Sequence, residues 1–449
     1  MIKLIFPHED LSRLAAAFRG QSLESFAIIL ARPVPFGAGS WRLLVESVNV
    51  PTDAEYKHRT EIAVEATAEF RLKHEARARR EKLSVIYCHS HPAQPGQVHF
   101  SPIDDASEKP LAAYAAERVP DLPHGALVIG AETIHARVLG RSMPIEVWQV
   151  GANVQRWAPT LSGSVGAQHD RQIRAFGELG QRALEALHVA VVGCGGTGSL
   201  TIQQLAYLGV KRYLLIDPDK LDETNLNRVV GTTKKDVGEW KVVLAKRLIK
   251  SVVLDAEVET VKGDILEKNV GALLKGVDLV MCCTDSHGSR HFLNRLAYQY
   301  YMPVIDMGVS IDTEDGAVTA ITGQARMLTP GVKCLYCTGG QLSARQVAWD
   351  LQHEEDRQRD PYFNQQSGVR QPAVISLNGT ASSQAVTLLL AAVAGVPIAA
   401  RSLLYRGLVG IMKLLEVKPN PMCFNCSPDA YLGQGDRHEL PHRSPAPST

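Results

Sequence analysis

Apolar positions in the first third of the chain follow two different spacings. The runs SFAIILA, at 25–31, and LSVIYCH, at 83–89, are short and continuous, as is typical of buried strands. Between them, residues 55–82 show a long helical pattern that ends in a heavily charged stretch, which favours a helix with one solvated face. The mixture of strand and helix patterns predicts an α+β domain.

Beyond residue 186, strand and helix patterns alternate regularly. Apolar strand patterns lie within 187–209, 211–219, 276–285 and 302–310, and helical patterns accompany them. This alternation predicts a parallel α/β sheet. The longest apolar stretch, AVTLLLAAVAGVPIAA, is interrupted by Gly395 and Pro397 and is short for a membrane span, so we expect a buried helix and its exit.

Length and local composition predict the domain boundaries. The chain has 449 residues, of which 45% are hydrophobic, and this is enough for more than one core. The segment WAPTLSGSVGAQ is rich in Ser, Gly, Ala and Pro and predicts a linker. We therefore expect a first domain at 1–150, a linker at 151–168 and a second domain at 169–428. Residues 429–449, rich in Pro, Ser, Gly and His, are expected to be disordered.

Charge and cysteine content narrow the classes of function. The formal net charge is only +1, which argues against a broad surface for nucleic acid. The N-terminus lacks the layout of a signal peptide, and eight cysteines are typical of metal-bound or buried thiols in a reducing compartment. We expect a cytoplasmic protein that binds neither nucleic acid nor membrane.

The segment CHSHPAQPGQVHFSPID concentrates residue types that bind metals. His89 and His91 alternate at the end of a predicted strand, so both imidazoles can leave the same face of the sheet. Asp104 would complete a set of three ligands and leave the fourth zinc position free for water. The alternative is an exposed or mutually satisfied polar pair that binds no metal.

Two further residues complete the chemistry of a hydrolytic site. Ser101 can donate a hydrogen bond to a developing oxyanion. Glu24, just before the run SFAIILA, is a candidate proton acceptor. The arrangement His-Ser-His, nine residues and then Ser-Pro-Ile-Asp resembles the motif of the JAMM (JAB/MPN+) metalloproteases, although the gap before the serine is slightly longer than usual in that family. The resemblance covers roughly 1–150.

This first resemblance implies a JAB/MPN fold and a zinc-dependent isopeptidase or peptidase, similar to deubiquitinases, that acts at the C-terminus of a ubiquitin-like protein. It also implies roles for five residues. His89, His91 and Asp104 hold the zinc, Glu24 is the general base and acid, and Ser101 stabilises the oxyanion.

A glycine-rich loop lies between a predicted strand and a predicted helix. Its glycines are Gly193, Gly195, Gly196 and Gly198. Glycines let the backbone approach phosphate groups, and the N-terminus of the helix favours their negative charge. Asp217, at the end of the next strand, is placed to bind a ribose hydroxyl. Taken alone, these features suit NAD as well as ATP.

The residues that follow favour ATP. A redox enzyme has no evident need for Asn225, Arg228 and Lys241, whereas AMP transfer requires cations around the polyphosphate and an acid that holds magnesium. From Asp170 to the C-terminal cysteines, the chain resembles the ThiF/MoeB/E1 superfamily, which adenylates the C-terminal carboxylate of ubiquitin-like proteins. The resemblance implies the following set: Asp217 binds ribose and Asp219 joins the nucleotide site, Asn225, Arg228 and Lys241 contact the phosphates, Asp285 holds magnesium, and Arg171 reaches the γ-phosphate in the partner subunit of a homodimer.

Two Cys-x-x-Cys knuckles predict a second metal. Cys334, Cys337, Cys423 and Cys426 can close a tetrahedral shell with no open position, which predicts a structural zinc. The alternatives are redox dithiols or a chance spacing. Thioester-forming E1 enzymes usually carry a cysteine after the first knuckle, but residues 338–371 contain none. The product is therefore expected to be the acyl-adenylate itself.

Together these features predict a bifunctional enzyme similar to bacterial-type JAB–E1 fusions. It would process or remove a ubiquitin-like protein and adenylate its C-terminus, using ATP, Mg²⁺ and two zinc ions. An E2-like protein or another acceptor would then act downstream. Two alternatives remain: activation of a sulfur carrier for cofactor or amino-acid synthesis, and an N-terminal domain that binds without catalysis.

Overall fold

The computed structural model describes residues 1–92, 94, 96–157, 166–339, 341–353, 357 and 372–443. The chain divides into two compact units. The N-terminal unit comprises Met1–Ser162 and Gly433–His438, and the C-terminal unit comprises Gly163–Leu432 and Glu439–Thr449.

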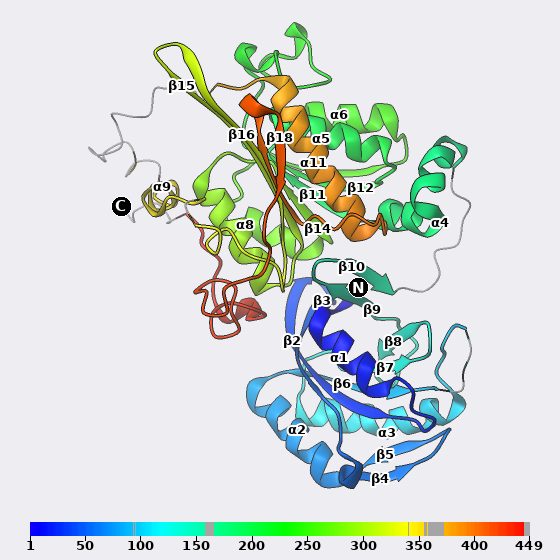
Figure 1. Ribbon diagram of the computed structural model, residues 1–449. Coiled ribbons are helices and arrows are strands. Elements are labelled where there is room, and N and C mark those ends of the chain that lie inside the picture. The colour runs from blue at the N-terminus through cyan, green and yellow to red at the C-terminus, as the bar shows by residue number, and fades with distance from the viewer. Residues whose placement is uncertain are drawn as a thin grey trace. The chain divides into compact units, whose positions relative to one another are not determined.

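The N-terminal unit is built on a mixed eight-stranded sheet (Figure 1). In spatial order the strands are β10 (Val154–Trp157), β9 (Glu146–Val150), β1 (Ile2–Pro7), β3 (Ser40–Asn49), β2 (Phe26–Gly37), β6 (Ser84–Ser90), β7 (Gly125–Ile129) and β8 (Ile134–Val138). The helices are α1 (His8–Phe18), α2 (Ala68–Glu81) and α3 (Pro102–Arg118). Alternate residues of β2 face different cores: Ile29 packs in a core with α1, and Ile28 packs in a core with α2 and α3.

The predicted helix at 55–82 is wrong in its first half. Residues Tyr56–Arg59 and Val64–Ala66 form the hairpin β4–β5, and α2 begins only at Ala68. Thr60 closes the hairpin by accepting hydrogen bonds from the turn, and Thr67 caps α2 by accepting from the amide N–H of Phe70 at 3.3 Å. Local side-chain to backbone hydrogen bonds therefore set the start of the helix later than the apolar pattern suggests.

The C-terminal unit contains the predicted α/β sheet. In spatial order its strands are β13 (Glu257–Val261), β12 (Arg212–Ile216), β11 (His188–Val192), β14 (Leu279–Cys282), β15 (Val304–Glu314), β16 (Ala317–Leu328), β17 (Ser402–Arg406) and β18 (Ile411–Leu414). The first five strands are parallel, as predicted. The strand order reverses between β11 and β14, and ligands bind at such a switch point in open α/β sheets.

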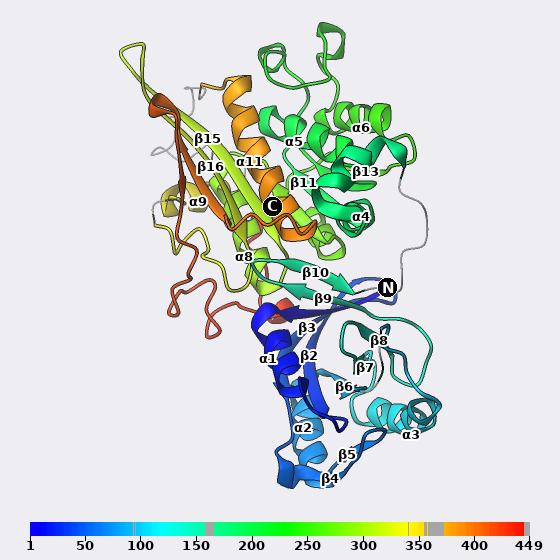
Figure 2. The ribbon, with the colours of Figure 1, turned by 45° about the vertical axis from the view of Figure 1, so that its right-hand side comes forward.

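Four helices share the main core with this sheet (Figure 2): α4 (Asp170–Ala186), α5 (Gly196–Tyr207), α6 (Lys241–Val252) and α11 (Ile375–Val393). The remaining longer helices are α7 (Lys268–Leu273), α8 (His287–Gln299) and α9 (Ala344–Asp350). Most of α11 is buried, and its second half belongs to the apolar stretch AVTLLLAAVAGVPIAA. The prediction of a buried helix in that stretch is therefore confirmed. No helix in the described part of the chain has the length and apolar character required to cross a membrane.

Four strands of the C-terminal unit were not predicted, namely β13, β16, β17 and β18. β16, β17 and β18 extend the parallel sheet with antiparallel pairs, beginning with a long β15–β16 hairpin. All four residues of β18 are exposed at the edge of the sheet, although Ile411, Met412 and Leu414 are apolar.

The structure also changes the two predicted irregular segments. Residues Val154–Trp157, placed in the linker at 151–168, form β10 and pair with β9, while 158–165 lie outside the described residues. The predicted disordered tail at 429–449 is wrong as far as Arg443. Gly435 there approaches β2 so closely that a Cβ atom would lie 2.8 Å from the Val34 side chain. Arg443 donates its amide N–H to the carbonyl oxygen of Leu266 at 2.9 Å.

Candidate nucleotide site and metal centres

The glycine-rich loop joins β11 to α5 at the switch point of the sheet. Gly193 has a φ of +91°, and a Cβ atom there would lie 2.8 Å from the carbonyl oxygen of Cys283. A Cβ atom on Gly198 would lie only 1.9 Å from the carbonyl oxygen of Gly193. Both positions therefore require glycine for the fold of the loop itself. Gly195 differs, because no described atom lies within 4 Å of its Cβ position, and the space above it is open.

Asp217 follows β12 and lies directly against the loop. One carboxylate oxygen accepts the amide N–H of Cys194 at 2.6 Å, and the other accepts the amide N–H of Asp219 at 2.8 Å. The side chain is buried. Burial raises the pKa of Asp217, while the charge of Lys241 and the two hydrogen bonds oppose that rise. The predicted ribose ligand thus also fixes the position of the loop.

Two of the predicted phosphate ligands follow the same strand. Lys241 is the first residue of α6, and its Nζ lies 2.7 Å from the Asp219 carboxylate. Asn225 ends a short 3₁₀ helix, where its side-chain oxygen accepts the amide N–H of Asp222 at 3.2 Å. Each side chain is therefore held in place by a neighbour from the same segment.

Arg228 and Asn378 lie over the glycine loop. A Cβ atom on Gly196 would lie 3.2 Å from the Arg228 side chain and 2.4 Å from the amide nitrogen of Asn378. Asn378 is buried in α11, more than 150 positions from the loop in the sequence. The sequence analysis missed Asn378, because no spacing or motif connects it to the glycines.

Asp285 and Arg171 are both exposed. Asp285 follows β14, which pairs with β11, so its carboxylate and the glycine loop lie beyond the carboxyl ends of neighbouring strands. The amide N–H of Cys283 donates to Val192 at 2.8 Å and keeps these two strand ends together. Arg171 lies in the first turn of α4.

Asp350 was missed by the sequence analysis. Its carboxylate accepts the amide N–H of Gly288 at 2.7 Å and fixes the start of α8 beside Asp285.

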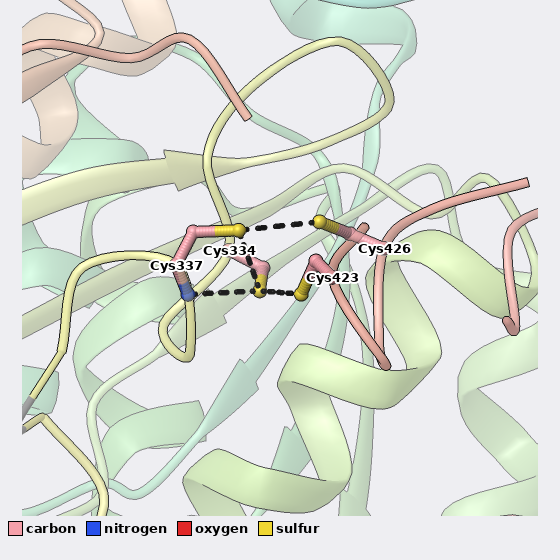
Figure 3. A group of neighbouring side chains, drawn as sticks. All are labelled: Cys334, Cys337, Cys423 and Cys426. Carbon is pink, nitrogen blue, oxygen red and sulfur yellow. Dashed lines mark hydrogen bonds between the residues drawn. The ribbon is translucent and has the colours of Figure 1, made fainter. Parts of the chain in front are cut away.

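The four knuckle cysteines form one cluster (Figure 3). Sγ–Sγ distances are 3.6 Å for Cys334–Cys337 and 3.5 Å for both Cys334–Cys423 and Cys337–Cys426. A tetrahedron with zinc–sulfur bonds of about 2.3 Å has edges of about 3.8 Å, so these residues fit a zinc ion. Hydrogen bonds among the thiols lower the pKa of Cys334 and raise the pKa of Cys426.

His89, His91 and Asp104 form the other candidate metal cluster of the described residues. The Nε2 atom of His89 lies 3.1 Å from the Nε2 atom of His91 and 3.1 Å from the Asp104 carboxylate. His91 Nε2 lies 3.5 Å from the same carboxylate. Tetrahedral zinc with bonds of about 2.1 Å separates its ligand atoms by about 3.4 Å, so the three side chains also fit a zinc ion.

Glu24 lies beside this cluster, as the sequence analysis expected. Its side chain is 7% exposed, and its carboxylate is 3.6 Å from His91 Nε2. The backbone carbonyl of Glu24 accepts from Arg59 at 2.8 Å, which fixes the segment before β2. Burial raises the pKa of Glu24, and the nearby imidazoles of His89 and His91 oppose that rise.

Ser101 has a structural contact that the sequence analysis missed. It caps α3: its hydroxyl donates to the Asp104 carboxylate at 2.8 Å and accepts the Asp104 amide N–H at 3.2 Å. Burial raises the pKa of Asp104. The hydrogen bonds from His89 and His91 have the larger effect in total and hold this pKa below its ordinary value. The cap therefore orients the carboxylate toward the imidazoles.

The four cysteines outside the knuckles are all buried. Cys88 lies in β6, Cys194 in the glycine loop, and Cys282 and Cys283 at the end of β14. Burial raises the pKa of each of these thiols above its ordinary value. Since thiolates are the reactive form, none of the four resembles an activated nucleophile.

Comparisons with known proteins concern the C-terminal unit. The sequence model of the ThiF family matches residues 169–425, more than half of the chain. The "SAMP-activating enzyme E1" of Haloferax volcanii is 32% identical over 161 residues, which are 36% of this chain and 56% of that protein. "Protein HesA" of Nostoc sp. is 29% identical over 161 residues, or 36% of this chain and 62% of that protein. The chain thus spans about three fifths of the length of these two relatives.

Two further similarities cover more of the chain. The "Molybdopterin-synthase adenylyltransferase" of Salmonella typhimurium is 28% identical over 268 residues, which are 59% of this chain and 98% of that protein. Among solved structures, Escherichia coli MccB with AMPCPP and MccA is 18% identical and covers 59% of this chain and 75% of that chain, with a TM-score of 0.49.

Proposed function

The chain belongs to the ThiF family, and we propose that its C-terminal unit uses ATP to adenylate the C-terminal carboxylate of a ubiquitin-like or sulfur-carrier protein. The observation that carries this proposal is the glycine loop at the switch point, with Asp217 against it and Arg228 above it. The alignment along almost the whole molybdopterin-synthase adenylyltransferase supports the same chemistry.

In the proposed reaction, a carboxylate oxygen of the partner attacks the α-phosphorus of ATP. The bond from that phosphorus to the β-phosphate oxygen breaks, pyrophosphate leaves, and the partner retains AMP as a mixed anhydride. Lys241, Arg228 and the loop N–H groups attract the phosphates, and Asp217 binds the ribose. Asp285 would hold magnesium, which supplies positive charge to the leaving pyrophosphate.

The reaction is proposed to end at the acyl-adenylate. An enzyme thioester requires an accessible thiolate within reach of the carbonyl. All eight cysteines lie in the described residues, and they are either in the four-sulfur cluster or buried. An E2-like protein or a sulfur-transfer enzyme would then receive the activated carboxylate, and the identity of that acceptor distinguishes protein conjugation from cofactor synthesis.

ATP–pyrophosphate exchange with a panel of ubiquitin-like and sulfur-carrier proteins tests this proposal. Exchange should require a free C-terminal carboxylate on the partner, so a C-terminally amidated copy is the matched control. Asp285→Ala should abolish exchange without changing the fold, since this carboxylate is exposed. A DTT-labile adduct between chain and partner on a non-reducing gel would refute the absence of a thioester.

For the N-terminal unit we propose a zinc-dependent peptidase or isopeptidase of the JAMM type that trims or removes the same ubiquitin-like partner. The convergence of Glu24, His89, His91 and Asp104 on one point carries this second function. Zinc held there would supply a Lewis acid that polarises the scissile carbonyl. Glu24 takes the proton of the attacking water and passes it to the leaving amine.

Cleavage of a ubiquitin-like protein with a C-terminal extension tests the second function. Glu24→Gln keeps the shape of the side chain but cannot accept the proton, so cleavage should stop while the zinc content stays at two per chain. Cleavage by the Glu24→Gln variant at the wild-type rate would contradict the assigned base. One zinc per chain in the wild type would instead favour a binding domain without catalysis.

A further inference from the structure

We propose that Arg137 is a positioning residue for the metal ligands of the N-terminal unit, a role that rests on the peptidase site proposed above. Arg137 lies on β8, at the edge of the sheet, and is not one of the ligands. Its guanidinium contacts the supports of two ligands at once: the aromatic ring beside His89 and the helix that carries Asp104.

The first support is Phe100, which precedes the cap residue of α3. The guanidinium of Arg137 lies 3.9 Å from the centre of the Phe100 ring. Phe100 also meets the imidazole of His89 edge-on, with the ring centres 6.2 Å apart. Movement of Phe100 would therefore allow the His89 ring to turn about its side-chain bonds. Arg137 limits that movement from β8.

The second support is α3 itself. Arg137 forms a fork with Glu108, with contacts of 2.8 and 3.2 Å, and a further ion pair with Asp105 at 2.7 Å. Glu108 is 5% exposed, and it also accepts the amide N–H of Gly140 at 3.0 Å. A bidentate contact with a planar guanidinium fixes direction as well as distance. Asp104 lies in the first turn of this helix, so the same fork sets where its carboxylate points.

The segment between the histidines and α3 contacts the β7–β8 region at another point. The amide N–H of Val98 donates to the Thr133 hydroxyl at 2.8 Å, and Val98 is buried. Val98 and Phe100 are thus both held from the region that contains Arg137. If a segment that joins two ligand-bearing elements moves, the metal site loses affinity, because the ligand geometry must be preserved within narrow limits.

Arg137→Met and Arg137→Lys separate positioning from simple packing. Methionine keeps much of the stem but loses the charge and the fork. We expect zinc affinity of the histidine site to fall by about 10-fold to 100-fold, as for other residues that support metal ligands. Lysine keeps the charge over Phe100 and one ion pair, so it should recover part of the affinity. If Arg137 only stabilised the fold, the zinc affinities of the two variants would not differ in this order.

Arg156 offers a matched control in the same unit. It lies on the other edge strand, β10, with its guanidinium 5.5 Å from the Trp148 ring and 2.7 Å from the Glu146 carboxylate. Its side chain is 23% exposed, compared with 14% for Arg137. Arg156→Met removes the same kinds of contact far along the sheet from the ligands. It should lower the melting temperature similarly and leave metal affinity unchanged.

The experiment uses the full chain and zinc or cobalt(II) alone. Zinc per chain is measured first, the histidine site is emptied by mild chelation, and cobalt(II) is titrated while its visible spectrum is recorded. Weaker binding and an altered spectrum in Arg137→Met, with Arg156→Met like the wild type, support the inference. Equal affinities and spectra in both variants overturn it.

The same titration separates this inference from the proposed function. If His89→Ala does not change the metal content, the wild type has no metal at this site and the proposed peptidase fails as well. If His89→Ala removes one metal and Arg137→Met binds cobalt(II) like the wild type, the site stands and only the role of Arg137 is refuted.

Discussion

Gly195→Ala is the most direct test of the proposed phosphate site, because it separates the shape of the free loop from its ligand. Gly195 caps α5 with a φ of −78°, outside the left-handed region, and no described atom lies within 4 Å of its Cβ position. Alanine is a poorer helix cap than glycine by about 1 kcal/mol. It also reduces the entropy of the unfolded chain, which recovers about 0.4–1 kcal/mol. The free protein should therefore keep its stability to within about 1 kcal/mol.

The added methyl group should matter only when phosphates approach the loop. ATP at 100 times its dissociation constant stabilises a protein by about 2.7 kcal/mol. For a unit of this size, that corresponds to a rise in melting temperature of about 5–10 °C. In Gly195→Ala we expect most of this rise to disappear, together with ATP–pyrophosphate exchange. The assay is a pair of melting curves, with and without MgATP, for each protein.

Gly198→Ala provides the contrasting result. Its Cβ atom would lie 1.9 Å from the carbonyl oxygen of Gly193, so the loop must move even without ATP. We expect this variant to lose stability in both melting curves. If Gly195→Ala retains the full stabilisation by MgATP, the nucleotide does not lie above Gly195 and the assignment of the loop is refuted.

Three further predictions follow from other parts of the chain. If Arg171 acts in the partner subunit, mixing Arg171→Ala with Asp285→Ala chains should restore some exchange activity, and a mixture as inactive as both parents would exclude a shared site. Burial lowers the pKa of His124 below 6.5, so the His124 imidazole binds a proton more tightly in the unfolded chain than in the folded one. The free energy of unfolding should therefore decrease as the pH is lowered below about 6.5, by at most about 1.4 kcal/mol per pH unit. His124→Gln should flatten that part of the melting-temperature profile, and an unchanged slope would contradict the assignment. Ending the chain after Leu432 removes 433–438 from the N-terminal unit. The melting temperature of this unit should fall, because apolar side chains of β2 and β3 become exposed. An unchanged melting temperature would show that the segment is dispensable.

Features encoded within short stretches could be predicted from the sequence. The strands around Ile29 and Ile86 are continuous apolar runs because both faces of the sheet are covered. The glycine loop was recognised because Gly193 and Gly198 are required by the backbone itself. His89 and His91 were paired correctly because residues two apart near a strand end leave the same face.

Features that depend on contacts distant in sequence could not be predicted. Asn378 reaches the glycine loop from α11, and Asp350 fixes the start of α8 from another helix. Neither residue has a local pattern that distinguishes it from an ordinary polar residue. The hairpin β4–β5 was hidden for a different reason, because its short strands lie within a charged stretch whose helical period continues into α2. Turn contacts made by Thr60 decide the outcome there.

The C-terminal segment shows why composition alone underestimates order. A segment rich in Gly, Pro and Ser pays a large entropy cost when one end is free, which is the basis for expecting disorder. Here the segment is anchored on both sides: Cys423 and Cys426 belong to the four-sulfur cluster, and Arg443 bonds to Leu266. The cost of closing a loop grows only slowly with its length, so residues between two anchors are ordered at much lower cost than a free end. Gly435 then needs only the close contact with β2 that its missing side chain permits.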